Sequence, residues 1–263
     1  MNGYKIFRTI LISIIVICLG YVAFYYINAA ISQNKNDKLA DISAKDYNVK
    51  TPKTGRVFTQ KLDVVYLGPE VLEKYKTLHD KNKNLIGWIK IADTNIDYPV
   101  VQSVNGNGEF YLDHDFDGKE DRNGTLFMDD KCDAKLPSDN LIIYGHNMKS
   151  GKMFGELTQY KSEKFYERHK KIFFDTIYDE GTYEVMYAFN SHIYSEGEIA
   201  FKYYQFIEPN SEEEFKSAMK SMAELSIYDT GVSAEWGDDL LTLSTCDYDE
   251  SQGRFVVVAK KVN

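Results

Sequence analysis

The chain begins with an apolar run that is long enough to cross a bilayer. Between Ile10 and Ile31 only three residues are not apolar, and no charged residue occurs between Arg8 and Lys35. About 20 apolar residues suffice for a spanning helix, which satisfies its own backbone hydrogen bonds in lipid. We therefore predict that residues 1–31 form a cytoplasmic tail and an uncleaved transmembrane anchor.

A cleavable signal peptide is the alternative for this segment. Its apolar core would be shorter, and the only nearby small-residue cleavage site, around Asn28-Ala29-Ala30, is weak. Lysines and arginines flank the run on both sides, so charge does not decide the orientation. Because the N-terminal tail is short, we expect a single-pass protein of the cell membrane whose large C-terminal portion is extracellular.

The pattern after the anchor divides into a polar stretch and a folded domain. Residues 32–68 carry mixed charge and few apolar positions, which indicates an extracellular stalk. From Pro69 a helical stretch begins, with apolar residues at helical spacing. Two further helices are predicted, one at about 154–169 and one that starts at Ser211 with a Ser-x-x-Glu capping box and continues to about Leu225.

Short β runs separated by Gly, Asn and Asp make up most of the domain, from Leu85 onward. Turn-forming residues between short strands favour a mainly β barrel or sandwich, which we expect to comprise residues 69–263. The predicted strands are 86–91, 96–102, 125–128, 141–144, 183–189, 201–207, 240–244 and 255–260.

Composition narrows the possible functions. The formal net charge is -9, and an acidic chain gains little from counterion release on a polyphosphate, so nucleic-acid binding is disfavoured. The three cysteines are Cys18, Cys132 and Cys246, too few for a disulfide-stapled scaffold. Cys132 lacks partner ligands at metal spacing and is interpreted as a bystander.

Cys246 stands where a reactive side chain could be presented. It ends the strand-like run that starts at Leu240, and Arg254 opens the next strand after a polar turn. A hairpin would bring Arg254 beside Cys246, where a guanidinium could stabilise a thiolate or an oxyanion. The alternative is a buried cysteine beside a surface arginine.

A cysteine nucleophile also needs a partner that transfers protons. Of the five histidines, His79 and His169 lie in charged helical stretches and are interpreted as solvated. His146 follows a strand and a glycine that leaves room for a close neighbour, and it is favoured modestly over His114 and His192.

Several motifs resemble those of sortases, the membrane-anchored cysteine transpeptidases of Gram-positive bacteria. Thr242-Leu-Ser-Thr-Cys246 followed by Arg254 resembles the sortase Thr-Leu-x-Thr-Cys…Arg signature, and Ile143-Tyr-Gly-His-Asn-Met148 resembles the histidine strand. The resemblance covers about Pro69 to the C-terminus and is nearest to class B. The segments that place it there are Ile86–Lys90, Asp97–Val100, Phe110–Phe116, Gly124–Met128 and the helix before the cysteine strand.

The resemblance implies a fold, a site and a reaction. The fold would be an eight-stranded sortase barrel with N-terminal helices and a helix inserted before the cysteine strand. Cys246 would attack the Thr carbonyl of a C-terminal Pro-x-Thr sorting motif, His146 would act as acid and base, and Arg254 would hold the oxyanion. Ser244 and Thr245 could bind substrate or have a structural role only.

The implied partners are surface proteins that bear a sorting signal and an amine of peptidoglycan or of a lipid-linked precursor. No cofactor and no metal are needed for this chemistry. Other interpretations are a cysteine hydrolase of the same fold, a non-catalytic wall-binding module, and a narrower role in polymerising pili.

Two further motifs are treated as coincidences. Asp113-x-Asp115-x-Asp117-Gly118 resembles the start of a calcium-binding EF-hand loop, but Gly124 stands where the bidentate Glu is required. Thr51–Gly55 itself resembles a sorting motif, although it is far from a C-terminus.

Overall fold

The computed structural model describes residues 3–47, 69–103, 106–195, 197–247 and 253–262. The sorting-like segment Thr51–Gly55, the rest of the predicted stalk after Tyr47, and most of the turn between Cys246 and Arg254 lie outside these ranges.

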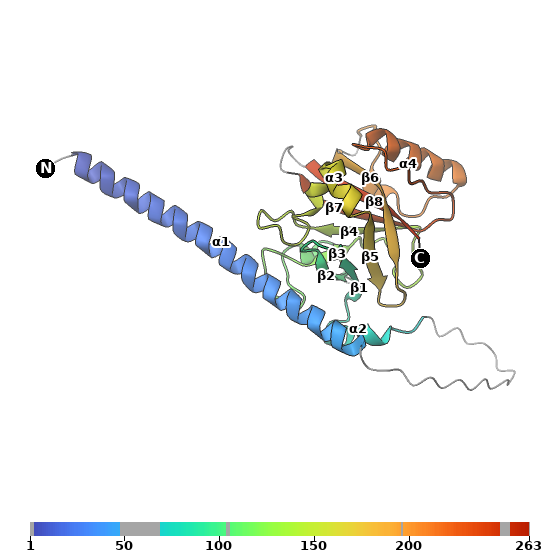
Figure 1. The fold of residues 1–263 in the computed structure, drawn as a ribbon, viewed down its shortest axis with the longest axis horizontal. Helices are drawn as coiled ribbons and strands as arrows, with labels where there is room; N and C mark the ends of the chain where they lie inside the picture. The colour runs from blue at the N-terminus through green and yellow to red at the C-terminus, as the bar shows by residue number, and fades with distance from the viewer. Residues whose placement is uncertain (1–2, 48–68, 104–105, 196, 248–252, 263) are drawn as a thin grey trace.

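Eight strands close into a barrel in the order β1-β2-β3-β4-β7-β8-β6-β5 (Figure 1). Two neighbouring pairs, β2 with β3 and β4 with β7, are parallel, and the other six pairs are antiparallel. The strands are β1 (Leu85–Lys90), β2 (Asp97–Val101), β3 (Leu126–Met128), β4 (Asn140–Gly145), β5 (Lys171–Thr176), β6 (Thr182–His192), β7 (Leu240–Asp247) and β8 (Gly253–Lys261). The predicted mainly β, eight-stranded fold is confirmed.

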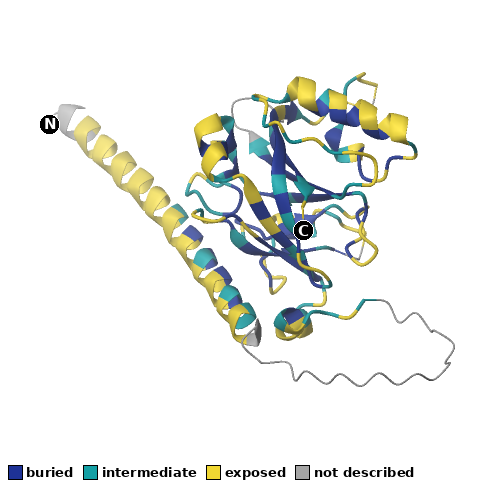
Figure 2. Ribbon diagram, turned by 45° about the vertical axis from the view of Figure 1, so that its right-hand side comes forward, coloured by how far each residue is buried: buried dark blue, intermediate teal, exposed yellow. Residues whose placement is uncertain are grey.

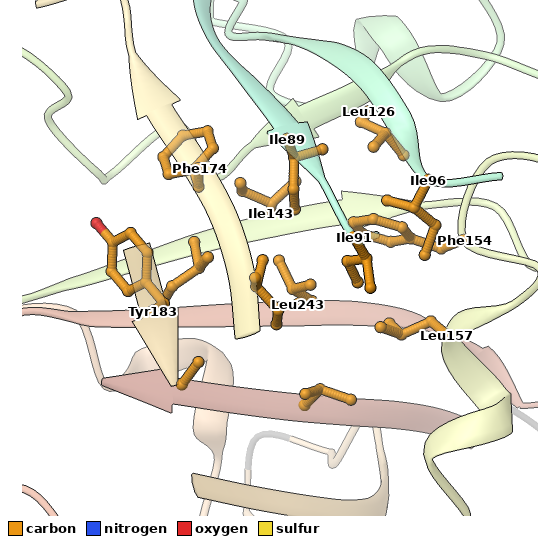
Figure 3. Packing of buried hydrophobic residues seen from close by; sticks show 14 of the residues in the cluster. Ile89, Ile91, Ile96, Leu126, Ile143, Phe154, Leu157, Phe174, Tyr183 and Leu243 are labelled. Atoms are coloured by element: carbon orange, nitrogen blue, oxygen red, sulfur yellow. The ribbon is translucent and has the colours of Figure 1, made fainter. Parts of the chain in front are cut away.

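The barrel interior is a continuous apolar core. Figure 3 shows Ile89, Ile143 and Leu243 pointing toward one another from three strands, with Phe174 and Tyr183 closing one end. Along β7 and β8 the side chains alternate, so that Leu243 and Val257 face this core while Leu240 and Val256 face a second cluster outside the barrel. This alternation decides which residues near the ends of these strands share a face.

The helix α4 (Glu212–Leu225) covers that second cluster, and it is the predicted insertion before the cysteine strand. Ser211 caps it as predicted, since the backbone N–H of Glu214 donates to the Ser211 hydroxyl at 3.2 Å. The Glu214 carboxylate accepts from the N–H of Asn210 instead of closing the box on Ser211.

Two of the predicted elements were wrong in detail, and one strand was missed. Residues 201–207 are not a strand: they contain the short 3-10 helix η3 (Tyr203–Gln205), whose aromatic neighbours pack beneath α4. The single helix expected at 154–169 is instead a 3-10 turn, η2 (Leu157–Lys161), and α3 (Glu163–Arg168), separated by the extended Ser162. Strand β5 was not predicted.

The N-terminal helix α1 (Gly3–Tyr47) is longer than the apolar run, and it is a helix that could span a membrane by length and composition. The structure continues this helix through the first part of the segment predicted to be a polar stalk. Figure 2 shows its N-terminal half exposed and buried residues along its C-terminal half, which contacts α2 and β2. The short 3-10 helix η1 (Phe110–Leu112) and helix α2 (Glu73–Lys81) complete the elements.

A buried stripe explains why α1 packs on the barrel. Ala29, Ser32, Asn36 and Leu39 recur at helical spacing and are all buried. Leu39 packs with residues of α2 and β1 in a third apolar cluster. Two polar contacts fix the same face: Tyr98 of β2 donates to the Gln33 side chain at 2.7 Å, and the Lys35 ammonium lies 2.7 Å from the Asp115 carboxylate.

Contacts within the chain therefore explain the position of the Asp115 carboxylate without a calcium ion. One of its carboxylate oxygens holds Lys35, and the other accepts from the backbone N–H groups of Asp117 and Lys119. The hydrogen bonds to Lys35 and to the backbone lower the pKa of Asp115 even though burial acts to raise it.

We expect Leu39→Ala to lower the free energy of unfolding by about 2–3 kcal/mol, because it removes a buried side chain from the contact between α1 and α2. Denaturant unfolding of a soluble chain that begins at Asn28 measures this. Asn34→Ala, on the exposed face of the same helix, is the control. Equal stability of the two variants would mean that α1 does not pack on the barrel in solution.

Candidate active site

The register of β7 and β8 places Cys246 and Arg254 directly opposite each other. The two strands pair antiparallel from Leu240 with Lys260 to Asp247 with Gly253, and Cys246 pairs with Arg254. Residues opposite each other in such a ladder point to the same face, with Cα atoms about 4.5–5.5 Å apart. The hairpin contact expected from the sequence is therefore present in the fold.

His146 reaches the same place from the other side of β7. Strands β4 and β7 are parallel, and their last paired residues are Gly145 and Thr245, so His146 and Cys246 are the next residues of the two strands. The Asn147 side-chain amide donates to the carbonyl oxygen of Cys246 at 2.8 Å, which fixes the two strand ends together. Of the three histidines left open, His146 is the one that lines the groove with Cys246.

Gly145 is required by the packing behind the histidine. A Cβ atom there would lie 2.3 Å from the Leu126 side chain and 2.8 Å from that of Phe154. The room that this glycine leaves is thus filled by the barrel core, and it lets β4 run close enough to carry His146 to the rim.

A groove of about 450 Å³ lies over these strand ends. Cys246, His146 and Arg254 all line it, and each is partly exposed. The walls come from η1 and the loop before it, from β3 and the loop after it, from β4, from the segment after β6 and from η3. Their residues are Gly108, Glu109, Leu112, Phe127, Asp129, Asp130, Lys131, Tyr144, Ile193 and Tyr204.

The protonation pattern of His146 follows from one hydrogen bond. Its Nε2 lies 2.7 Å from the carbonyl oxygen of Leu112. A carbonyl oxygen can only accept, so Nε2 carries a proton, and in the neutral ring Nδ1 is the basic nitrogen. The hydrogen bond also fixes the orientation of the imidazole ring. A general base needs a fixed orientation to transfer protons to and from one position.

Ser244 and Thr245 lie at the base of the groove, and both are buried. The Thr245 hydroxyl donates to the carbonyl oxygen of Gly145 at 2.7 Å, across the β4–β7 pair. The Ser244 hydroxyl lies 2.7 Å from that of Tyr203. Both hydroxyls thus hold neighbouring elements in place, and a role in binding substrate stays a prediction.

Two tyrosines that the sequence analysis did not single out help to build the site. Tyr144 donates to the Asp129 carboxylate at 2.9 Å, and burial, assisted by that carboxylate, raises the pKa of Tyr144. Burial raises the pKa of Tyr203 to about 12, although the hydrogen bond to Ser244 and the charge of Arg254 act against it. Both phenols stay protonated at neutral pH. Tyrosines in strands are usually packing residues, so no local pattern distinguishes these two.

Cys132 is in a different situation from Cys246. Its side chain is 4% exposed, it lies in the barrel core, and burial raises the pKa of its thiol to about 12. A thiol reagent needs access and a thiolate. The structure supports the interpretation of Cys132 as a bystander.

We expect iodoacetamide at neutral pH to modify Cys246 and to leave Cys132 intact in the folded chain, because only Cys246 lies in an open groove. Peptide mass mapping of a chain with Cys18→Ser measures this, and Cys246→Ala should abolish the modification. Unfolding in denaturant should make Cys132 reactive. Equal labelling of both cysteines in the folded protein would contradict the assignment.

The comparisons with known proteins agree on one family. The model of the Sortase domain matches residues 89–262, more than half of the chain. The chain is 32% identical over 212 residues to Sortase B of Listeria monocytogenes, covering 78% of this chain and 81% of that protein. It is 34% identical over 197 residues to Sortase B of Staphylococcus aureus, covering 72% and 75%.

Solved structures give the same result. The crystal structure of sortase B from B. anthracis in complex with AAEK1 superimposes with a TM-score of 0.72 at 30% identity, covering 90% of this chain and 99% of that chain. The Staphylococcus aureus sortase B–substrate complex gives a TM-score of 0.71 at 25% identity, with the same coverage.

Proposed function

Because this chain belongs to the sortase family, as a class B member that is a cysteine transpeptidase, we propose that Cys246 is its nucleophile, His146 its acid and base, and Arg254 its oxyanion-stabilising residue. The observation that carries this assignment is the strand register, which pairs Cys246 with Arg254 and places His146 directly after the end of β4, beside the same groove.

The proposed substrates are surface proteins with a C-terminal sorting motif that contains Pro-x-Thr. One of the similar solved structures is a sortase B–substrate complex, which supports a substrate-binding groove in the family. In this chain the groove is open to solvent, so an extended peptide could lie across Cys246 between the η1 wall and the Tyr204 wall.

The first half-reaction would acylate the enzyme. The Cys246 sulfur forms a bond to the Thr carbonyl carbon, and the C–N bond to the next residue breaks. The proton lost by the thiol passes through His146 to the leaving nitrogen, which departs as a neutral amine. Negative charge develops on the carbonyl oxygen, where the Arg254 guanidinium can donate hydrogen bonds to it.

The second half-reaction would reverse the roles. An amine of peptidoglycan or of a lipid-linked precursor forms a bond to the same carbonyl carbon, and the C–S bond breaks. His146 takes the proton from the incoming nitrogen and returns it to the sulfur. Amide exchange in two acyl transfers thus uses all three residues twice.

The proposed topology follows from α1. Residues 1–31 would form the cytoplasmic tail and the membrane span, and the barrel, residues 69–263, would be extracellular beside the wall.

We expect the soluble chain, mixed with Pro-x-Thr-Gly and Pro-x-Thr-Asn peptides, to form a thioacyl adduct on Cys246 that mass spectrometry detects. A Gly or diaminopimelate peptide should convert the adduct to a ligated product. Cys246→Ala should form no adduct, while Cys132→Ala, which changes the buried thiol, should behave as wild type. An adduct that only water resolves would identify a hydrolase, and a folded protein with no adduct would contradict the proposal.

We also expect Arg254→Ala to lower the rate of adduct formation about 100- to 1,000-fold, the loss typical of removing an oxyanion donor. Arg254→Lys keeps the charge but loses the planar fork, so it should recover only part of the rate. Single-turnover kinetics with excess enzyme measures both. Unchanged rates in Arg254→Ala would remove this residue from the mechanism.

A further inference from the structure

A buried hydroxyl near the groove has no hydrogen-bond partner. Ser191 is 6% exposed, and none of the described residues forms a hydrogen bond with its Oγ. Two other side-chain atoms share this condition, in His79 and Ser150, but those residues are not buried as a whole. Buried polar groups are nearly always hydrogen-bonded, so the lack of a partner for the Ser191 hydroxyl requires an explanation.

The sheet register places Ser191 next to Arg254. Strands β6 and β8 pair antiparallel, and Ser191 stands directly opposite Arg254. Since Arg254 also stands opposite Cys246 on its other side, the three residues form one row across β6, β8 and β7. Arg254 is in the middle of this row.

The neighbouring row shows which face they share. Phe189 and Val256 pair with each other, and Val256 pairs with Ser244. Phe189 and Val256 both belong to the cluster beneath α4, outside the barrel. Because side chains two residues apart on a strand share a face, Ser191, Arg254 and Cys246 also point outward.

Ser191 is placed to act on Arg254 and not on a substrate. It does not line the groove, whereas Arg254 and Cys246 do. One Arg254 Nη donates to the carbonyl oxygen of Gly253 at 3.0 Å. A guanidinium has five N–H donors in a planar fork, so it can hold its own strand, a buried acceptor and a substrate oxygen together.

We propose that Ser191 is a positioning residue for Arg254: when a substrate is bound at Cys246, the Ser191 hydroxyl oxygen accepts a hydrogen bond from the guanidinium, a bond that does not exist in the structure without substrate, and thereby directs other guanidinium donors to the substrate carbonyl oxygen. This inference rests on the proposed function, since it requires that a peptide carbonyl is attacked at Cys246. It assigns to β6 a part in the reaction that its sequence does not reveal.

Ser191→Thr and Ser191→Val form the test, because Thr and Val have the same shape and differ in the hydroxyl. We expect Ser191→Val to form the thioacyl adduct about tenfold more slowly than Ser191→Thr in single-turnover experiments, the effect of one hydrogen bond to a charged group. Alkylation of Cys246 by iodoacetamide involves no carbonyl to hold, so its rate should be equal in the two variants.

Two controls separate positioning from packing. In an Arg254→Ala background the difference between Thr and Val at position 191 should vanish. Thr176→Val removes a buried hydroxyl that bonds to the backbone of Asp179, away from the groove, and should leave the rate of adduct formation unchanged while lowering stability.

Equal acylation rates in Ser191→Thr and Ser191→Val, with wild type active, would overturn this inference and leave the proposed function intact. A difference that persists in the Arg254→Ala background would overturn it as well, because the hydroxyl would then act without the guanidinium. A wild-type chain that forms no adduct would overturn both the inference and the proposed function.

Discussion

Main-chain hydrogen bonds between four neighbouring strands set the position of every group in the candidate site. Strands β4, β7, β8 and β6 are adjacent in the barrel, and their registers bring His146, Cys246, Arg254 and Ser191 to one end of the sheet. A slip of one residue in any pair would turn a side chain to the opposite face. The apolar barrel core disfavours such a slip, because it would expose core residues and bury polar ones.

The polar residues of the site begin where the apolar core of the barrel ends. Along β7 the buried Leu241 and Leu243 give way to Thr245, and along the other face Ser244 leads to Cys246. The hydroxyls at this boundary bond to β4 and to Tyr203, so the strand ends are held by specific contacts as well as by the ladder. A reactive side chain at the rim of a rigid sheet keeps its geometry better than one on a free loop.

The helix α1 is continuous from the candidate membrane span to the part that packs on the barrel. Its buried stripe packs against the outside of β2 and against α2, and the Lys35–Asp115 ion pair joins it to the loop before β3. The same loop leads into the η1 wall of the groove, where Leu112 accepts the hydrogen bond from His146. The candidate membrane helix and the candidate acid–base residue are thus linked through one packed region.

The sequence predicted the strands that bear the site and missed features decided by tertiary packing. Cys246, His146 and Arg254 were identified because their motifs resemble those of sortases and stand at strand ends. Strand β5 was missed because the exposed Phe173 stands between the buried Ile172 and Phe174 and breaks the alternation of apolar and polar residues. Residues 201–207 were taken for a strand because aromatic residues are common in strands. Neither the extension of α1 to Tyr47 nor the place of Ser191 can be read from local pattern, since each depends on a distant partner.

In the proposed mechanism the strand register aligns His146, Cys246 and Arg254 around one carbonyl group. A crystal structure of the chain with a Pro-x-Thr peptide whose terminal carbonyl carries a thiol-reactive group would test this most directly. We predict a covalent bond to the Cys246 sulfur, with the carbonyl oxygen within hydrogen-bond distance of the Arg254 guanidinium and the His146 ring beside the sulfur. A covalent adduct whose carbonyl oxygen points away from Arg254, or a peptide bound outside the groove, would contradict the account.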